Sequence, residues 1–205
     1  MTSILTGDII NSRSISSNEW LPLLKATFKT VGKTPKTWEI YRGDSFQIEI
    51  NNVENALLFA IKLKTILKKF KNLDVRIAIG IGTKNDNYEN ITEGSGEAFI
   101  NSGKAFDTIV KKQNLGIISP WEDINKIFNT SFALALLTID NWTVNSADFV
   151  IKYLNKPKAT QKIIAKELNI SESSASERRK RAGLDEIIQL EKLYRELINR
   201  KIAKI

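Results

Sequence analysis

The chain has 205 residues, of which 42% are hydrophobic and 26% are charged, as in an ordinary folded globular protein. Its formal net charge of +8 favours contact with nucleic acid, nucleotides or an anionic surface. The chain has no cysteine and no histidine, which excludes disulfides, histidine-based triads and metal sites built on sulfur or imidazole.

Oxygen atoms would have to hold any metal ion in this chain, so magnesium, calcium or manganese would be preferred. No signal peptide and no membrane-spanning apolar run is visible in the sequence. We therefore expect a cytoplasmic protein without a membrane partner.

The first 120 residues alternate predicted strands and helices. We expect strands over 3–10, 38–41, 46–50, 74–82 and 115–119, and helices over 20–31, 53–70 and 97–110. The second and third strands should form a hairpin. The order β-α-β-β-α-β-α-β, with right-handed crossovers and short connections, predicts an α+β domain with a ferredoxin-like, palm-type sheet. Another two-layer α/β domain is the alternative.

The sequence from Trp121 to the end has no strand pattern. Phe128, Phe132, Leu136 and Ile139 form a helical stripe, and we interpret residues 121–145 as a helical linker. Residues 146–205 would then form a separate all-α domain, which begins with a short helix over 146–154.

A helix-turn-helix pattern follows in this last domain. Thr160 and Ser171 are placed to cap two helices, and the spacing of Ala165, Leu168 and Ile170 is typical of the core of such a motif. Residues 156–181 contain eight Lys and Arg against three Glu, so this stretch carries +5 of the net +8. A solvated helical hairpin with a charged face is the alternative.

The second helix of this motif is expected to contact DNA. Its small residues permit close approach to a groove, and its basic end can reach phosphates. The candidate residues are Ser173, Ser174, Ser176, Arg178, Arg179, Lys180 and Arg181. A final amphipathic helix over 184–198 would close the module or pair two copies, so a homodimer is plausible.

Two Gly-Asp pairs lie in apolar segments that are predicted to form strands or strand ends. Gly7-Asp8 lies in the first predicted strand, and Gly43-Asp44 lies in the predicted hairpin. A carboxylate beside a core is costly unless it is paired, and two that meet repel unless a cation lies between them. Convergence of Asp8 and Asp44 would therefore predict a metal site. Gly-Asp is also a common turn dipeptide, so turn chemistry is the alternative.

The N-terminal part resembles the class III nucleotide cyclases and their palm-like relatives. The resemblance rests on Asp8-Ile9 in the first strand, Gly43-Asp44 in the hairpin, the strand over 76–82, and Gly96 before a helix. Over most of residues 3–119 the chain is also similar to the bacterial SatD family. That similarity rests on the Gly-Asp-Ile start, the Gly-Asp-Ser-Phe-Gln hairpin, Gly96-Glu97-Ala98-Phe99 and Ser102-Gly103.

The resemblance implies a role for each matching position. Asp8 and Asp44 would be the candidate catalytic residues and, with the carbonyl of Ile9, would hold Mg²⁺ against a nucleoside triphosphate. The loop over 11–14 leads into a helix and would bind phosphate oxygens. The candidate nucleotide-binding residues are Asn11, Ser12, Arg13, Asn101 and Lys104.

The sequence departs from the cyclase pattern in two places. Cyclases of this class carry a purine-reading lysine on the strand before Gly-Asp, where this chain has Trp38 and Ile40. They also carry an Asn followed four residues later by a transition-state Arg, whereas Asn101 is followed by Ala105. Lys104 lies nearby, but a lysine ammonium is a point charge and lacks the forked hydrogen-bond donors of an arginine. Both departures put cyclase activity in doubt and leave metal and nucleotide binding open.

We therefore predict a DNA-binding transcriptional regulator with a cyclase-like, metal- and nucleotide-binding N-terminal domain. An active Mg²⁺-dependent nucleotidyl transferase or cyclase that acts on nucleoside triphosphates is the alternative. A third hypothesis is an interaction module that binds protein through its C-terminal helices.

Overall fold

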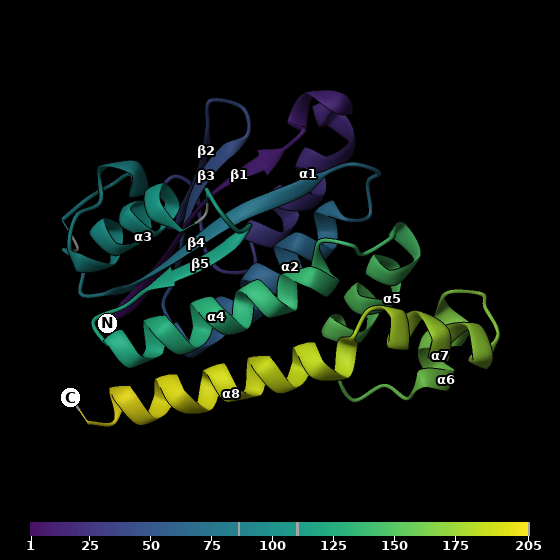
Figure 1. The fold of residues 1–205 in the computed structure, drawn as a ribbon. Helices are drawn as coiled ribbons and strands as arrows, with labels where there is room; N and C mark the ends of the chain where they lie inside the picture. The colour runs from purple at the N-terminus through teal and green to yellow at the C-terminus, as the bar shows by residue number, and fades with distance from the viewer. Residues whose placement is uncertain (86, 110, 205) are drawn as a thin grey trace.

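A computed structural model describes residues 1–85, 87–109 and 111–204 and has a mixed α+β architecture (Figure 1). The sheet has five strands in the order β2-β3-β1-β4-β5. Neighbouring strands are antiparallel, except that β4 and β5 are parallel. Every predicted strand is confirmed to within one residue at each end: β1 (Thr2–Ile10), β2 (Trp38–Tyr41), β3 (Ser45–Ile50), β4 (Asp74–Gly82) and β5 (Leu115–Ile118).

Side chains alternate between the two faces of the sheet, because successive residues of a strand point to opposite sides. Leu5 and Ile9 of β1 lie in the main core with α1 (Ser17–Phe28) and α2 (Ala56–Leu67). On the other face, Thr6 donates a hydrogen bond to Ser102 of α3 (Glu97–Thr108), with an O–O distance of 3.1 Å. The predicted last residue of this helix, Val110, lies outside the described residues.

A glycine in β4 sets how closely α3 approaches the sheet. A Cβ at Gly80 would lie 2.1 Å from the backbone nitrogen of Ser102. Any side chain at this position would therefore push the helix away, as expected of a glycine that serves strand packing.

The described residues after Trp121 contain helices and no strand, as the sequence predicts. These helices are α4 (Glu122–Ile139), α5 (Val144–Asn155), α6 (Gln161–Glu167), α7 (Glu172–Arg181) and α8 (Leu184–Ile202). None of the helices in the described part of the chain is long and apolar enough to cross a membrane. One continuous hydrophobic core includes side chains of the sheet, α4, α5 and α8. The domain boundaries near residues 120 and 145 stay a prediction.

The last helix, α8, lies along α4 and returns toward the start of the sheet domain (Figure 1). Tyr194 is fully buried, and its hydroxyl donates to the carbonyl of Val53 at 3.2 Å. Its ring meets Phe128 edge-on, with centroids 5.1 Å apart. Near the end of α8, Lys201 forms an ion pair with Asp123. The apolar face of α8 is thus used inside the chain, and the homodimer stays a prediction.

A buried ion cluster joins α2, the start of β4 and the end of α4. The ammonium of Lys64 is completely buried and lies 2.9 Å from one carboxylate oxygen of Asp74 and 2.9 Å from one of Asp140. Lys68 binds the other carboxylate oxygen of Asp74 at 2.8 Å. The cluster fixes the first residue of β4, and therefore the position of the strand beside the Gly-Asp pairs.

Candidate functional site

The two predicted aspartates line one pocket of ≈ 840 Å³ beside the end of β1. Asp8 lies in β1 opposite Ser45 of β3, and Asp44 immediately precedes that partner. The backbone nitrogen of Ile9 donates to the carbonyl of Asp44 at 3.0 Å. The strand register therefore brings these residues into one pocket, together with the predicted Ile9, Asn11, Ser12 and Arg13.

Local backbone geometry explains the second Gly-Asp pair. Arg42 and Gly43 form the turn between β2 and β3 with φ angles of 53° and 88°. Nothing lies within 4 Å of a Cβ built at Gly43, so the positive φ, and not lack of space, favours glycine here. The turn places Asp44 beside the loop that follows β1, where Ser12 donates to its carboxylate at 2.7 Å.

The carboxylate of Asp8 is held by an arginine from the neighbouring strand. Asp8 and Arg76 are register partners on β1 and β4. The Nε of Arg76 donates to one carboxylate oxygen at 2.8 Å, and its Nη2 donates to the other. This two-pronged hydrogen bonding raises the pKa of Arg76 above its ordinary value. Arg76 thus places a positive charge beside Asp8, while Asp44 is held by a neutral hydroxyl.

The remaining pocket lining is basic. Four cationic side chains and two carboxylates line the pocket, which gives it a net charge of about +2. The cations are Arg13, Arg76, Lys111 and Lys112, and Asn114 adds an amide. Such a lining favours an anion with several oxygen acceptors, such as a phosphate group.

Sequence reasoning missed four of these residues. Arg76 is the one charged residue inside the otherwise apolar run 75–82, and Lys111-Lys112 is a charge pair in the connection between α3 and β5. These charged residues are evident in the sequence. That they and Asn114 lie in one pocket with Asp8 depends on the order of the strands in the sheet, which short motifs do not predict.

Two predicted nucleotide-binding residues lie elsewhere. Asn101 is buried on α3 and donates to the carbonyl of Ile81 at 2.7 Å. Along β4, Ile81 lies about 16 Å from Arg76 at the usual rise per residue. Lys104 is exposed on α3 and does not line the pocket. Asn101 therefore serves to hold α3 on the end of β4.

The donor set fits an anion better than a magnesium ion. Within the described residues, no three acidic side chains come together in a group that could hold a metal ion. The carboxylates of Asp8 and Asp44 already accept hydrogen bonds from Arg76 and Ser12. A cation bound by Asp8 would lie beside the guanidinium of Arg76, and the two positive charges would repel each other. The magnesium site stays a prediction.

A second candidate site lies at α6 and α7, where both predicted caps are confirmed. Thr160 accepts a hydrogen bond from the backbone nitrogen of Ile163 at 3.4 Å, and Ser171 accepts one from Ser174 at 3.1 Å. Between the helices, Asn169 has a left-handed backbone with φ of 52°. Buried alanines, Ala165 and Ala175, permit close contact between the two helices.

Fewer residues of α7 are exposed than the seven that the sequence predicts to contact DNA. Ser173, Ser176, Lys180 and Arg181 are exposed, whereas Ser174 and Arg178 are half-buried. Arg179 binds Asp185 of α8 and lies over the ring of Tyr153, with its guanidinium carbon 5.3 Å from the ring centroid. The hydrogen bond from Arg179 lowers the pKa of Asp185. Arg179 thus joins α7 to α8 and α5.

The end of α7 is anchored to the preceding helices. The indole nitrogen of Trp142 donates to the carbonyl of Ala182 at 2.8 Å in a buried setting. Gly183 follows with φ of 56°, and a Cβ built there would lie 3.0 Å from the Thr138 methyl group. These contacts fix the direction in which α7 presents its exposed side chains.

Comparison of the chain with protein-family models, with curated proteins and with solved structures found no significant match. The resemblances to the nucleotide cyclases and to the SatD family therefore stay predictions.

Proposed function

We propose that the chain is a DNA-binding regulator whose sheet domain binds a phosphate-bearing ligand, of which a nucleotide is the best candidate. The observation that carries the proposal is the capped α6–turn–α7 unit with a basic, exposed end on its second helix. Such a unit places a helix in the major groove and its cations on the phosphates.

The sheet supports a palm-like N-terminal domain. In a ferredoxin-like fold two β-α-β units interleave, so the first strand lies between the third and the fourth. Here β1 lies between β3 and β4, with β2 beyond β3. The fifth strand adds a parallel edge beside β4.

A nucleotide suits the pocket at β1 in two respects. The cations of Arg13, Lys111 and Lys112 can bind phosphate oxygens. The carboxylate of Asp44 lies in the same pocket and can accept a hydrogen bond from a ribose hydroxyl. The transferase or cyclase alternative would need Asp8 to hold a metal ion, and the Arg76 contact does not favour it.

Removing both exposed cations at the end of α7 is expected to weaken DNA binding. Lys180→Ala with Arg181→Ala should lower the affinity for a labelled duplex about tenfold or more, because two phosphate contacts are lost. Fluorescence anisotropy at about 50 mM salt, where electrostatic binding is strong, provides the measurement.

The matched control is Lys25→Ala with Lys29→Ala, which removes two exposed lysines at α1. The control loses the same two positive charges as the α7 variant, so it accounts for the change in net charge. Its affinity for DNA should be close to that of the wild type. Equal affinities for the α7 variant and the control, or no binding by the wild type at low salt, would rule out the proposed DNA surface.

Nucleotide binding at the β1 pocket is expected to need Arg76 and not Mg²⁺. Calorimetry with GTP or ATP in the presence of EDTA should show binding by the wild type. Arg76→Ala should weaken it about tenfold or more, because a charged hydrogen-bond donor is lost and Asp8 is left uncompensated.

Arg200→Ala is the control, since it removes an exposed arginine of α8 whose ion pair with Glu196 lies at the surface. Binding that appears only with Mg²⁺ and is abolished by Asp44→Asn would instead identify the predicted metal site.

A further inference from the structure

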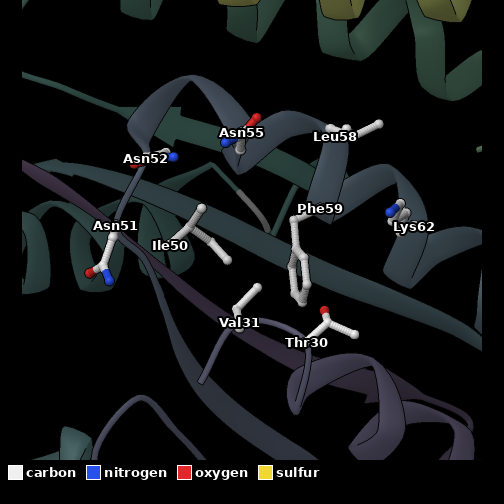
Figure 2. Close-up of a pocket in the computed structure, with 9 residues that line it drawn as sticks. All are labelled: Thr30, Val31, Ile50, Asn51, Asn52, Asn55, Leu58, Phe59 and Lys62. Atoms are coloured by element: carbon white, nitrogen blue, oxygen red, sulfur yellow. The ribbon is translucent and has the colours of Figure 1, made fainter. Parts of the chain in front are cut away.

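A second pocket of ≈ 420 Å³ lies between the residues that follow α1, the end of β3 and the start of α2 (Figure 2). It shares no lining residue with the pocket at Asp8 and Asp44. Neither the proposed DNA surface on α7 nor the proposed phosphate site uses this pocket.

The floor of this pocket is apolar. Figure 2 shows the side chains of Val31, Ile50 and Phe59 directed toward one another. Ile50 and Phe59 are only 5% and 6% exposed, so their remaining surface faces this hollow. An apolar floor that includes an aromatic ring suits the face of a flat ligand, and the volume lies in the usual range for small-molecule sites.

Hydrogen-bond donors border this floor. The carbonyl oxygen of the Asn55 side chain accepts from Arg195 of α8 at 2.7 Å, so its amide nitrogen remains to meet a ligand. In the described part of the chain, neither the Lys62 ammonium nor the Asn52 amide has a side-chain hydrogen bond or ion pair. The pocket thus presents a cation and amide donors for which the described residues supply no partner.

We propose that this pocket binds a purine base through its acceptor edge, with guanine as the preferred base. Guanine presents two acceptors, O6 and N7, on one edge, and a lysine ammonium is a common partner of that edge. An amide NH2 that faces the same edge can donate one further hydrogen bond. Adenine replaces O6 with an amino donor, which would face the donors of Asn55 and Lys62. Because Arg195 fixes the orientation of the Asn55 amide, this side chain cannot turn to accept from adenine while that contact persists.

Guanosine is the appropriate probe, because it has no phosphate that would bind at the basic pocket beside Asp8. Titration of the wild-type chain with guanosine, monitored by calorimetry or NMR, should show saturable binding at one site. Lys62→Met keeps most of the side-chain stem and removes the charge, and we expect it to weaken binding about tenfold. Asn52→Ala should weaken binding at least about fivefold, because one hydrogen-bond donor is lost. Adenosine should bind several-fold more weakly than guanosine.

Lys25→Met is the matched control, since it removes an exposed lysine of α1 outside this pocket, and its guanosine affinity should equal that of the wild type. Sodium triphosphate, which should enter the pocket beside Asp8, is expected not to displace guanosine. No saturable binding by the wild type, unchanged affinity in both Lys62→Met and Asn52→Ala, or displacement by triphosphate would each overturn the proposal. Guanosine binding is expected whether or not the wild type binds DNA, because the two sites share no residue.

Discussion

Replacing Lys64 by alanine is expected to lower the free energy of unfolding by about 3–5 kcal/mol, as measured by urea denaturation. The ammonium is completely buried and lies 2.9 Å from carboxylate oxygens of both Asp74 and Asp140. Its removal leaves buried negative charge that Lys68 balances only in part, and it also leaves a cavity.

Lys25→Ala is the control for this experiment, because its exposed side chain should change stability by no more than about 0.5 kcal/mol. A loss below about 1 kcal/mol in Lys64→Ala would contradict the role given to the cluster. Asp74 begins β4 two positions before Arg76. The same variant should therefore also weaken ligand binding at the β1 pocket.

Replacing Tyr194 by alanine is expected to lower the free energy of unfolding by about 3–5 kcal/mol, the usual cost of removing a buried aromatic side chain. The ring is fully buried against Phe128, and its hydroxyl donates to Val53. Thermal unfolding followed by circular dichroism provides the measurement. A loss near zero would mean that α8 is not docked on the sheet domain as described.

Tyr194→Phe is the matched control, since it keeps the ring and loses one hydrogen bond worth about 1 kcal/mol. Burial raises the pKa of the Tyr194 hydroxyl above its ordinary value of 10.0. A raised pKa means that the folded chain keeps a proton that the unfolded chain loses, so this stabilisation is complete below about pH 10 and is lost as the pH rises further. The wild type should therefore lose more stability than Tyr194→Phe between about pH 9 and pH 11. If the free energies of unfolding of the wild type and Tyr194→Phe fell equally over this pH range, burial of the Tyr194 hydroxyl would be contradicted.

Local sequence signals predicted most of the secondary structure. The alternation of β-branched residues in 74–82 gave β4 with its correct ends, and the hydroxyls of Thr160 and Ser171 gave the starts of α6 and α7. These signals act within a few residues, so a single sequence can reveal them.

The contacts between distant segments could not be predicted in the same way. The pairing of Asp8 with Arg76 requires the register of β1 against β4, and no motif specifies that register. The position of Asn101 depends on how α3 lies against Gly80, and the docking of Tyr194 depends on how α8 lies along α4. The caps and charges of α7 were readable, whereas the structural contacts of Arg179 with Asp185 and Tyr153 were not.

The salt dependence of DNA binding by the wild type and by Lys180→Ala with Arg181→Ala tests whether α7 binds DNA through its cations. Binding through phosphate contacts gives a linear decrease of the logarithm of the affinity with the logarithm of salt concentration. We predict that the slope for the double variant is shallower by about 2, one unit for each lost contact. Identical slopes, or a wild-type affinity that does not change with salt, would contradict the assignment of α7 as the surface that binds DNA.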